Sequence, residues 1–579
     1  MKRTIKLTIL LIVAAMLLGA CTTQTTAPTT APTTGGATTA ATTTEAEGRE
    51  VITLDLMMLG LQAFSDKINQ SLDSPIFDEI EAQTGVRLTF TGTTGDQKDV
   101  ILASRATTDI ITVISTDECE ALIQGEMVIP LDDLINEYAP NVRDLYPDRL
   151  ESSRNDLSNG TGKVFFLPSN CGNGAPPQRI DIGAFTTRWD YYAAMGYPEV
   201  SSPEDMLDLL VDMQAAYPTT ADGLKTYGIS GTSASMAQRW LYQYQYLKID
   251  NSNNDAFVDV MSCDIKFQYG DPDSVYWNGI KYLNQAYRLG ILDPEILTQT
   301  EEDYTKKVTN GQVLSPDIRW LGILDFNATA EEKYGPGAGY VSLPVAGFVH
   351  NPGYDAAGWG PTFSLAICST CQYPERAMEL INYMYGYEGS RLVNSGVEGR
   401  DWTYVDGVPT LTNFAIAKWL TGGDTWEVKN LWTYFSNFFG IKAGTVCPDG
   451  GQVNLYQDSA IYSKTLISCD KSYCDYYQVS YPYEKILNMI EEGTAYSADE
   501  WDSRIATGTG AAGDDIARID TKIENIAVTY VPQCVLAKTD AEFEALQTQM
   551  LSEMDANGYE QSVADWTARF EAAKAKYLP

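Results

Sequence analysis

Few side chains in this sequence suit acid–base or nucleophilic catalysis. The 579 residues include a single histidine, His350, in the turn-like run Val-His-Asn-Pro at residues 349–352. A Ser-His-Asp triad needs one well-placed histidine, and zinc hydrolases usually need two or three as ligands. We therefore interpret His350 as a loop residue and not as a catalytic base. Paired carboxylates stay open as a catalytic device, because the chain contains 77 acidic residues.

Cysteine chemistry is the second possibility. Beyond Cys21 the chain has nine cysteines, an odd number, so at least one thiol stays unpaired even where disulfides form. Cys368 and Cys371 could bind a metal together with Cys469 and Cys474, but the second pair lacks the usual two-residue spacing. We expect local disulfides or buried free thiols at these positions, and no metal site or cofactor.

The first 21 residues predict export and attachment to a membrane. Three basic residues among the first six precede an apolar run from Leu7 to Leu18, which leads into Leu-Gly-Ala-Cys21. This pattern is typical of a signal peptide, here residues 1–20, and its cysteine makes it similar to the bacterial lipobox. Two or three acyl chains on Cys21, at about 0.8 kcal/mol for each buried CH₂, would hold the protein on a membrane almost permanently. The alternative is an ordinary secretory signal that happens to contain cysteine.

Charge and composition exclude some partners and predict a tether. The formal net charge of −37 repels phosphate backbones, so we expect no nucleic-acid binding. Residues 21–48 consist almost entirely of Thr, Ala, Pro and Gly, which cannot bury a core. They are predicted to form a Thr-rich disordered tether between the lipid anchor and the folded part.

The elements that must position a site alternate between strand and helix. Strands are predicted over 51–57, 86–90 and 108–114, with helices ending near Gly85 and Ala103. Such apolar strands separated by helices imply a parallel sheet, in which ligands bind beyond the carboxyl ends of the strands. The loops 59–62, 115–117 and 169–173 are therefore candidates. Further predicted elements are strands 163–168, 182–187, 340–344 and 359–367, a largely helical stretch 231–311, and helices 276–289, 375–387 and 540–576.

Short motifs run in a fixed order from about Leu102 to Gly407. They include LAS with DI at 102–110, IPLDDLI with YAPN at 129–141, GK and LP within 162–168, R-x-D at 188–190, YLN to PE at 282–295, and GVEG with WTYVDG at 396–407. Their order and spacing resemble the family 1 extracellular solute-binding proteins, the lipoproteins of bacterial carbohydrate ABC importers. The tyrosine at 191, where the family has tryptophan, is a departure.

The resemblance implies an α/β, two-lobed class II periplasmic-binding-protein fold with a hinge between the lobes and a helical C-terminal region. The implied divisions are 1–20 signal peptide, 21–48 tether, 49–183 first part of lobe 1, 184–339 lobe 2, 340–400 return to lobe 1, and 401–579 completing both lobes. Many relatives carry a calcium loop where this chain has only Asp222 as a carboxylate between Tyr217 and Gly223. One carboxylate cannot supply six or more oxygen ligands, so no calcium is expected there.

The resemblance further implies a monomeric, non-enzymatic receptor on the outer face of the bacterial cell membrane. It would capture a sugar or oligosaccharide between the lobes and deliver it to the permease subunits of an ABC importer. A sugar presents apolar C–H faces and hydroxyl rims, which suit aromatic rings and planar polar groups. The candidate ligand-binding residues are Trp240, Trp320, Trp359, Asp117, Asn170 and Arg319. The alternatives are an extracellular glycoside hydrolase, a receptor for a non-sugar ligand such as a peptide, and a surface adhesin.

We expect the substitution Cys21→Ser to release the protein from the membrane fraction, because serine cannot form the thioether that carries the lipid. Fractionation of cells that express each form measures this directly. If the serine variant still sediments with membranes, another anchor exists and the lipobox interpretation is wrong.

Overall fold

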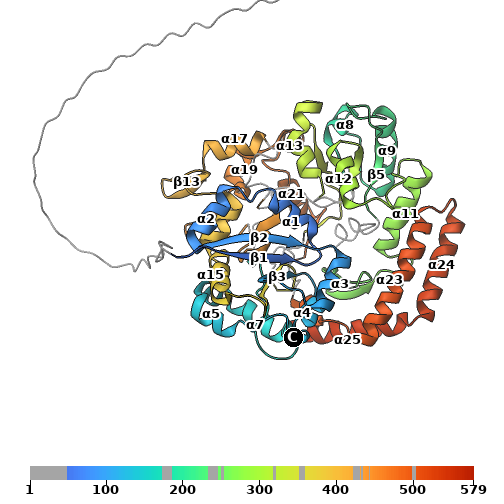
Figure 1. Cartoon of the computed structure of the whole chain (residues 1–579). Helices are drawn as coiled ribbons and strands as arrows, with labels where there is room; N and C mark the ends of the chain where they lie inside the picture. Colours follow the sequence, from blue (N-terminus) through green and yellow to red (C-terminus); the bar gives the residue numbers. More distant parts are fainter. Residues whose placement is uncertain are drawn as a thin grey trace, which may run out of the picture. The chain divides into compact units, whose positions relative to one another are not determined.

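The computed structural model describes residues 49–172, 185–232, 246–249, 253–316, 321–350, 359–421, 431, 434–442, 444–498, 502 and 504–578. Cys21, Trp240, Arg319 and Trp320 lie outside these ranges. The described chain folds into two α/β lobes with a helical C-terminal region (Figure 1). Among the helices in the described ranges, none is both long and apolar enough to cross a membrane.

The first lobe is built around a four-stranded sheet of order β12-β3-β1-β2. Its strands are β1 (Ile52–Met58), β2 (Val86–Gly92), β3 (Ile110–Val113) and β12 (Ser364–Ile367). The first three are parallel, whereas β12 runs antiparallel to β3, with Ser364 opposite Val113. All residues of β3 and β12 are buried. The predicted alternation of strands and helices at the start of the chain is therefore confirmed.

Helices and short segments from two distant stretches of chain complete this lobe. They are α1 (Gln62–Asn69), α2 (Pro75–Thr84), α3 (Gly95–Ser104), α4 (Thr116–Gln124), α5 (Asp132–Tyr138), α6 (Pro140–Leu145), α7 (Pro147–Asp156), α15 (Pro374–Met384), α16 (Tyr387–Ser395), β13 (Trp402–Val405), β14 (Val408–Leu411), α17 (Asn413–Thr421), η2 (Phe435–Phe438), η3 (Leu455–Gln457) and α19 (Ser459–Thr465). Gly85 ends α2 in the left-handed conformation that glycine adopts readily, as the prediction of a helix end there requires.

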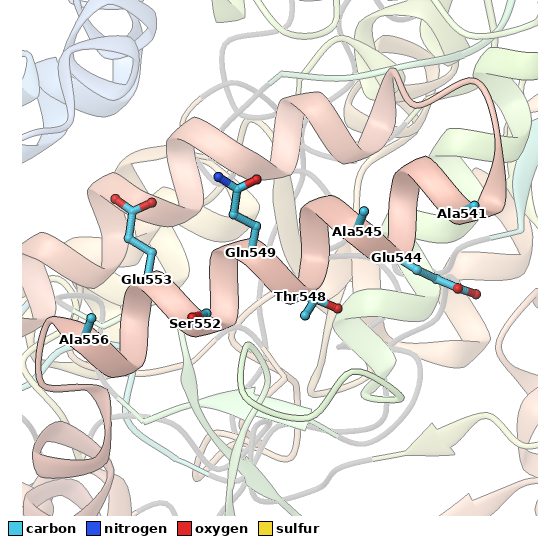
Figure 2. A pocket seen from close by; sticks show the side chains of 8 residues that line it. All are labelled: Ala541, Glu544, Ala545, Thr548, Gln549, Ser552, Glu553 and Ala556. Carbon is cyan, nitrogen blue, oxygen red and sulfur yellow. The ribbon is translucent and has the colours of Figure 1, made fainter.

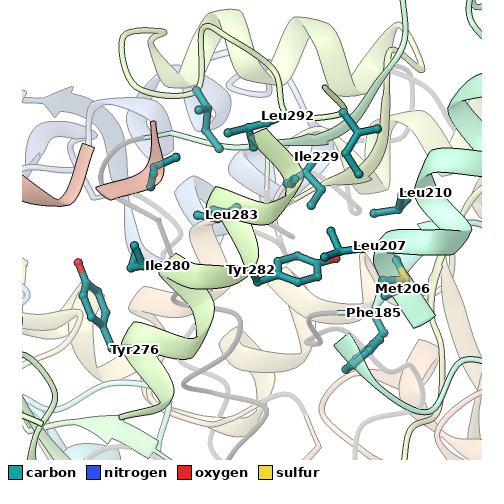
Figure 3. Close-up of a cluster of buried hydrophobic side chains, with 14 of the residues drawn as sticks. Phe185, Met206, Leu207, Leu210, Ile229, Tyr276, Ile280, Tyr282, Leu283 and Leu292 are labelled. Atoms are coloured by element: carbon teal, nitrogen blue, oxygen red, sulfur yellow. The ribbon is translucent and has the colours of Figure 1, made fainter. Parts of the chain in front are cut away.

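The second lobe contains two strand pairs that lie side by side. Strand β4 (Thr186–Arg188) pairs antiparallel with β10 (Tyr340–Ser342), and β5 (Tyr227–Ser230) pairs parallel with β9 (Val313–Pro316). The hydroxyl of Ser315 donates to the carbonyl of Thr186 at 2.7 Å and so joins the pairs. Helices α8 (Trp189–Ala194), α9 (Pro203–Ala216), α11 (Val275–Arg288), α12 (Glu301–Thr309) and α13 (Ile323–Tyr334) surround them. Figure 3 shows side chains of α11 and α9 pointing toward one another in this core.

The Arg-x-Asp segment at 188–190 has a structural role in this lobe. Arg188 is 0% exposed, and its guanidinium binds both carboxylate oxygens of Asp190, at 2.9 and 2.6 Å. The rings of Tyr191 and Tyr334 lie 4.0 and 4.4 Å from the guanidinium carbon. Because a buried charge is costly unless it is paired and hydrogen-bonded, this arrangement fixes the start of α8 against α13.

Several predicted elements differ from the structure. The stretch 231–311, predicted as largely helical, contains the antiparallel sheet β6 (Tyr246–Lys248), β7 (Ala256–Asp259) and β8 (Asp264–Phe267) before α11 begins. These strands have three or four residues each, too few to establish a period of two in the sequence. The predicted strand 163–168 forms only an isolated bridge, Leu167 to Leu365, and the strand predicted over 359–367 is confined to β12.

Three further predictions, one at His350 and two for later helices, differ from the structure. His350, predicted in a loop, ends the two-residue strand β11 (Val349–His350), which pairs with β15 (Tyr496–Ser497). The helix predicted over 375–387 ends at Met384, and α16 follows. The helix predicted over 540–576 is two helices, α24 (Asp540–Ala556) and α25 (Tyr559–Tyr577), separated at Gly558 with φ +98°. Helices α20 (Ser468–Tyr477), α21 (Glu484–Glu491), α22 (Arg504–Thr509) and α23 (Asp514–Val535) complete the described elements.

A buried carboxylate ties the small antiparallel sheet to the C-terminal helices. Asp255 accepts hydrogen bonds from the backbone N–H of Tyr269 at 2.6 Å and from the hydroxyl of Tyr559 at 2.8 Å. Burial raises the pKa of Asp255 to about 7, because the ionised form loses its hydration. In the unfolded chain the ordinary carboxyl pKa is about 3.9.

We expect the free energy of unfolding to depend on pH through Asp255. Between about pH 4 and 7 the unfolded chain loses this proton while the folded chain keeps it, so the contribution of Asp255 to stability falls as pH rises. Asp255→Asn removes the titration, so the melting temperature of the variant minus that of the wild type should increase from pH 4.5 to 7.5. Asp264→Asn, at a carboxylate in β8 whose pKa is lowered by hydrogen bonds from Ser262 and Lys574, is the control and should show no such increase. A constant difference for Asp255→Asn would contradict the prediction.

Candidate ligand-binding site

The carboxyl edge of the first-lobe sheet gathers loops from four stretches of chain. Strand β1 ends at Met58 and β3 at Val113, while the antiparallel β12 begins at the same edge with Ser364. The bridge between Leu167 and Leu365 places the segment after residue 167 beside the start of β12. The positions predicted as loops from the strand ends therefore meet at one edge, although Gln62 already begins α1, Thr116 begins α4, and residue 173 lies outside the described ranges.

Ser169 joins its own segment to the start of β12 and to a further segment around residue 437. Its hydroxyl lies 2.9 Å from the carbonyl oxygen of Phe363 and 2.7 Å from that of Asn437. The next backbone N–H, of Asn170, donates to the carbonyl of Phe439 at 2.6 Å. The segment that contains Ser169 and Asn170 is thus held along residues 437–439, which lie far away in the sequence.

Two residues at this edge have left-handed backbones without being glycine. Asn170 has φ +56° and Phe363 has φ +61°. Asparagine tolerates this conformation, whereas for an aromatic residue it is unusual and costs free energy. Such conformations persist only where the surroundings fix them, and they are frequent at binding sites. Together with the contacts of Ser169, these two conformations indicate that specific interactions fix the backbone at this edge.

Aromatic rings cover the same edge. Phe64 of α1 lies 5.6 Å from Phe363 and 5.3 Å from Tyr434, measured between ring centroids, and Phe438 lies 5.5 Å from Phe363. Phe438 is buried, whereas the other three rings are half-buried. We call Phe64, Phe363, Tyr434 and Phe438 the aromatic cluster. Partly exposed rings of this kind can stack on the apolar face of a ligand while remaining anchored in the core.

The second lobe approaches the aromatic cluster through α13. Lys67 Nζ of α1 lies 3.9 Å from a carboxylate oxygen of Asp325, which is in the first turn of α13. Burial, and in addition the negative charge of Asp325, raise the pKa of Tyr434 to about 12. The Tyr434 hydroxyl therefore stays protonated at neutral pH and can donate a hydrogen bond. The first lobe offers flat rings and the Tyr434 hydroxyl, and the second lobe offers the carboxylate of Asp325, a combination suited to binding a polyhydroxylated molecule.

The structure describes three of the six predicted site residues, and these three lie in different places. Asn170 lies at the edge that carries the aromatic cluster. Asp117 lies in the first turn of α4, which follows β3, and its side chain is exposed. Ser115 is the N-cap residue of this helix. Trp359 is half-buried, and the guanidinium carbons of Arg149 and Arg504 lie 3.4 and 5.1 Å from its ring centroid. The roles of these residues in ligand binding stay predictions, as do those of the residues outside the described ranges, Trp240, Trp320 and Arg319.

Sequence reasoning missed the four rings of the aromatic cluster. Phe64 lies two residues after the predicted loop 59–62, and this position could have suggested it. Nothing local marks Tyr434 or Phe438, because both reach the edge through contacts with Phe64, which lies more than 200 positions away. Cys368 and Cys474 carry buried free thiols, one of the two outcomes expected, whereas the free thiol of Cys371 is only half-buried. In the part of the chain that the structure describes, no group of three or more His, Cys, Asp or Glu could hold a metal ion.

One concave surface lies away from this edge. It has a volume of about 830 Å³ and is lined only by α24, including Glu544, Thr548 and Glu553 (Figure 2). A second hollow, of about 370 Å³, lies between β8, the start of α11 and Tyr559. Neither shares a lining residue with the aromatic cluster. A shallow surface on one helix face lacks the convergent groups that a small-molecule site needs.

The chain resembles known proteins in sequence and in fold. A family model described as bacterial extracellular solute-binding protein matches residues 65–390. No curated protein matches the sequence. Among solved structures, an alginate-binding protein without calcium ion has a TM-score of 0.59 at 12% identity, over 90% of this chain and 98% of that one.

Two further similar structures come from Streptococcus pneumoniae. An N-glycan transport solute-binding protein in complex with Man5GlcNAc has a TM-score of 0.56 at 13% identity, over 91% of this chain and 100% of that one. An ABC-transporter substrate-binding protein in complex with kestose has a TM-score of 0.58 at 14% identity, over the same shares, 91% and 100%. At these identities the likeness shows the two-lobed fold.

We expect the left-handed backbone of Asn170 to make its replacement by alanine costlier than its replacement by glycine. Asn170→Ala should lower the free energy of unfolding by about 1 kcal/mol relative to Asn170→Gly, because alanine is strained at positive φ. Chemical denaturation measures both values. Asn159, with φ +47° in an exposed turn, provides the matched pair of control substitutions and should show a similar difference. Equal stability of the two Asn170 variants would contradict the strain at this edge.

Proposed function

This chain belongs to the bacterial extracellular solute-binding protein family, and we propose that it is the membrane-anchored receptor of a carbohydrate ABC importer. In this proposal Cys21 carries the lipid anchor on the outer face of the membrane. A monomer captures a sugar or oligosaccharide between the lobes and presents it to the permease subunits. The proposal keeps the predicted lobe divisions at 49–183, 184–339, 340–400 and 401–579.

The observation that carries the proposal is the aromatic cluster opposite α13. Phe64, Phe363 and Tyr434 present partly exposed rings at the carboxyl edge of the first lobe, and Asp325 of the second lobe lies within reach of Lys67 beside them. The apolar face of a sugar ring packs on aromatic carbon, while its hydroxyls bind carboxylates and protonated phenols. A ligand that contacts both lobes favours their closed arrangement over the open one by its differential affinity.

The ligands of the similar structures support a carbohydrate. The names of these proteins include alginate binding, and two of them were solved with Man5GlcNAc and with kestose. These ligands differ in charge and in linkage, so they support the class of ligand and not a particular sugar. Membership of a binding-protein family favours a receptor over the alternative of a glycoside hydrolase.

Binding and turnover separate the receptor from the enzyme. We expect a panel of oligosaccharides to contain at least one that raises the melting temperature of the mature chain and is recovered intact by chromatography. Products of shorter length would indicate a hydrolase. If no oligosaccharide in the panel shifts the melting temperature and a peptide library does, the ligand class is wrong.

We expect Tyr434→Leu to weaken the affinity for such a sugar while leaving the fold intact. Ring stacking on nucleic-acid bases contributes about 1–3 kcal/mol per contact, and stacking on a sugar should be of that order or less. Since 1.4 kcal/mol corresponds to about ten-fold in affinity, calorimetry resolves the loss. Tyr373→Leu is the matched control: Tyr373 is 49% exposed and precedes α15, beyond the opposite end of β12. An unchanged Kd for Tyr434→Leu would remove the aromatic cluster from the site.

A further inference from the structure

The last helix of the chain reaches from the second lobe to the first. Helix α25 packs in the second lobe through Trp566 and Phe570, which share a core with residues of β7. At its end, Lys576 Nζ and the Tyr577 hydroxyl donate to the two carboxylate oxygens of Asp156, at 2.8 and 2.7 Å. Asp156 ends α7 of the first lobe, and its side chain is only 4% exposed.

Alternating cations and rings extend this contact. Arg149, two turns before Asp156 in α7, lies over the ring of Trp359 at 3.4 Å. Arg504 of α22 lies 5.1 Å from the centroid of Trp359 and also 5.1 Å from that of Tyr577. Trp359 belongs to the stretch of chain that returns from β10 in the second lobe to β12 in the first. Cation–π contacts of this kind gain strength as they are desolvated.

These residues lie together where the two lobes meet the stretch of chain that connects β10 to β12. We name the group the C-terminal clasp, and it consists of Arg149, Asp156, Trp359, Arg504, Lys576 and Tyr577. Another contact between the lobes, Lys67 with Asp325, joins half-exposed side chains at 3.9 Å. An exposed ion pair of this length contributes little. The clasp has a buried carboxylate and direct hydrogen bonds, so it is the stronger connection of the two.

We propose that the C-terminal clasp is a positioning device that sets how far the lobes open and thereby the affinity for ligand. The clasp residues hold the arrangement in which the lobes approach each other at α1 and α13. Loosening them lowers the fraction of molecules that are competent to bind. The apparent Kd then rises by the reciprocal of that fraction. The part of this inference that concerns ligand affinity rests on the proposed function, whereas the part that concerns the opening of the lobes does not.

A clasp residue has a signature that a ligand-contacting residue lacks. Because the clasp changes a population and not a contact, its loss weakens the binding of every ligand by the same factor. A residue that contacts ligand changes the ratio of affinities between two different ligands. A residue that only stabilises the fold lowers the melting temperature without opening the lobes.

The test compares two lysines on the same helix. In the double variant Lys576→Met, Tyr577→Phe we expect the ligand-free mature chain to show a larger radius of gyration by small-angle X-ray scattering. Lys574→Met is the matched control, because Lys574 contacts Asp264 at 3.3 Å within the second lobe, and it should scatter like the wild type. The Kd values for two oligosaccharides that bind the wild type should rise by one common factor, about five-fold, in the double variant alone.

Three results would overturn the proposal. One is unchanged scattering in the double variant. Another is a change in affinity that is confined to one sugar, which would indicate contact with ligand. The third is an equal effect of Lys574→Met. The scattering needs no ligand, so a protein that binds no sugar but opens in the double variant would contradict the proposed function and support the clasp. If the double variant does not fold, Tyr577→Phe, which removes one oxygen atom, takes its place in every comparison.

Discussion

The pairing of β12 with β3 is the constraint on which the two-lobed arrangement depends. Strand β3 has β1 on one side and would otherwise leave its other edge unpaired in the interior. An unpaired buried edge is costly, because each of its unpaired N–H and C=O groups has lost its hydrogen bond to water and gained no other. The strand that fills the position comes from residues 364–367, beyond the whole first part of the second lobe. The chain must therefore leave the first lobe, build the second and return.

The same return brings the site together. Phe363 directly precedes β12, and its carbonyl binds the Ser169 hydroxyl at the sheet edge. The register of β12, with Ser364 opposite Val113, thus decides where the aromatic cluster stands relative to α1. A shift of one residue would turn every β12 side chain to the other face and exchange the large Leu365 and Ile367 with the small Ser364 and Ala366, so the packing of this strand also fixes the geometry of the site.

Features that depend on neighbouring residues could be predicted from the sequence, whereas features that depend on contacts between distant segments could not. The first strands and helices, and the loops at their carboxyl ends, could be predicted because apolar runs and glycine stops lie within a few residues of one another. Ser169 and Asn170 fell inside such a loop. Tyr434 and Phe438 could not be predicted, because only the tertiary fold brings them to Phe64 and Phe363. The short strands β6 to β8 were missed because three or four residues cannot display a period. Likewise, the segment at 188–190 could be recognised, but its buried ion pair is visible only in the structure.

The late arrival of β12 has a consequence for biosynthesis. The first sheet cannot be completed until residue 367 has emerged from the ribosome, since Ile367 pairs with Ile110. Pairing of segments separated by some 250 residues is slow, because the loop between them must be closed before any contact stabilises it. During translation the early strands therefore remain incomplete and easily unfolded. A nascent chain in that condition can still be threaded through a narrow translocation channel, whereas a lobe that closed early would block it.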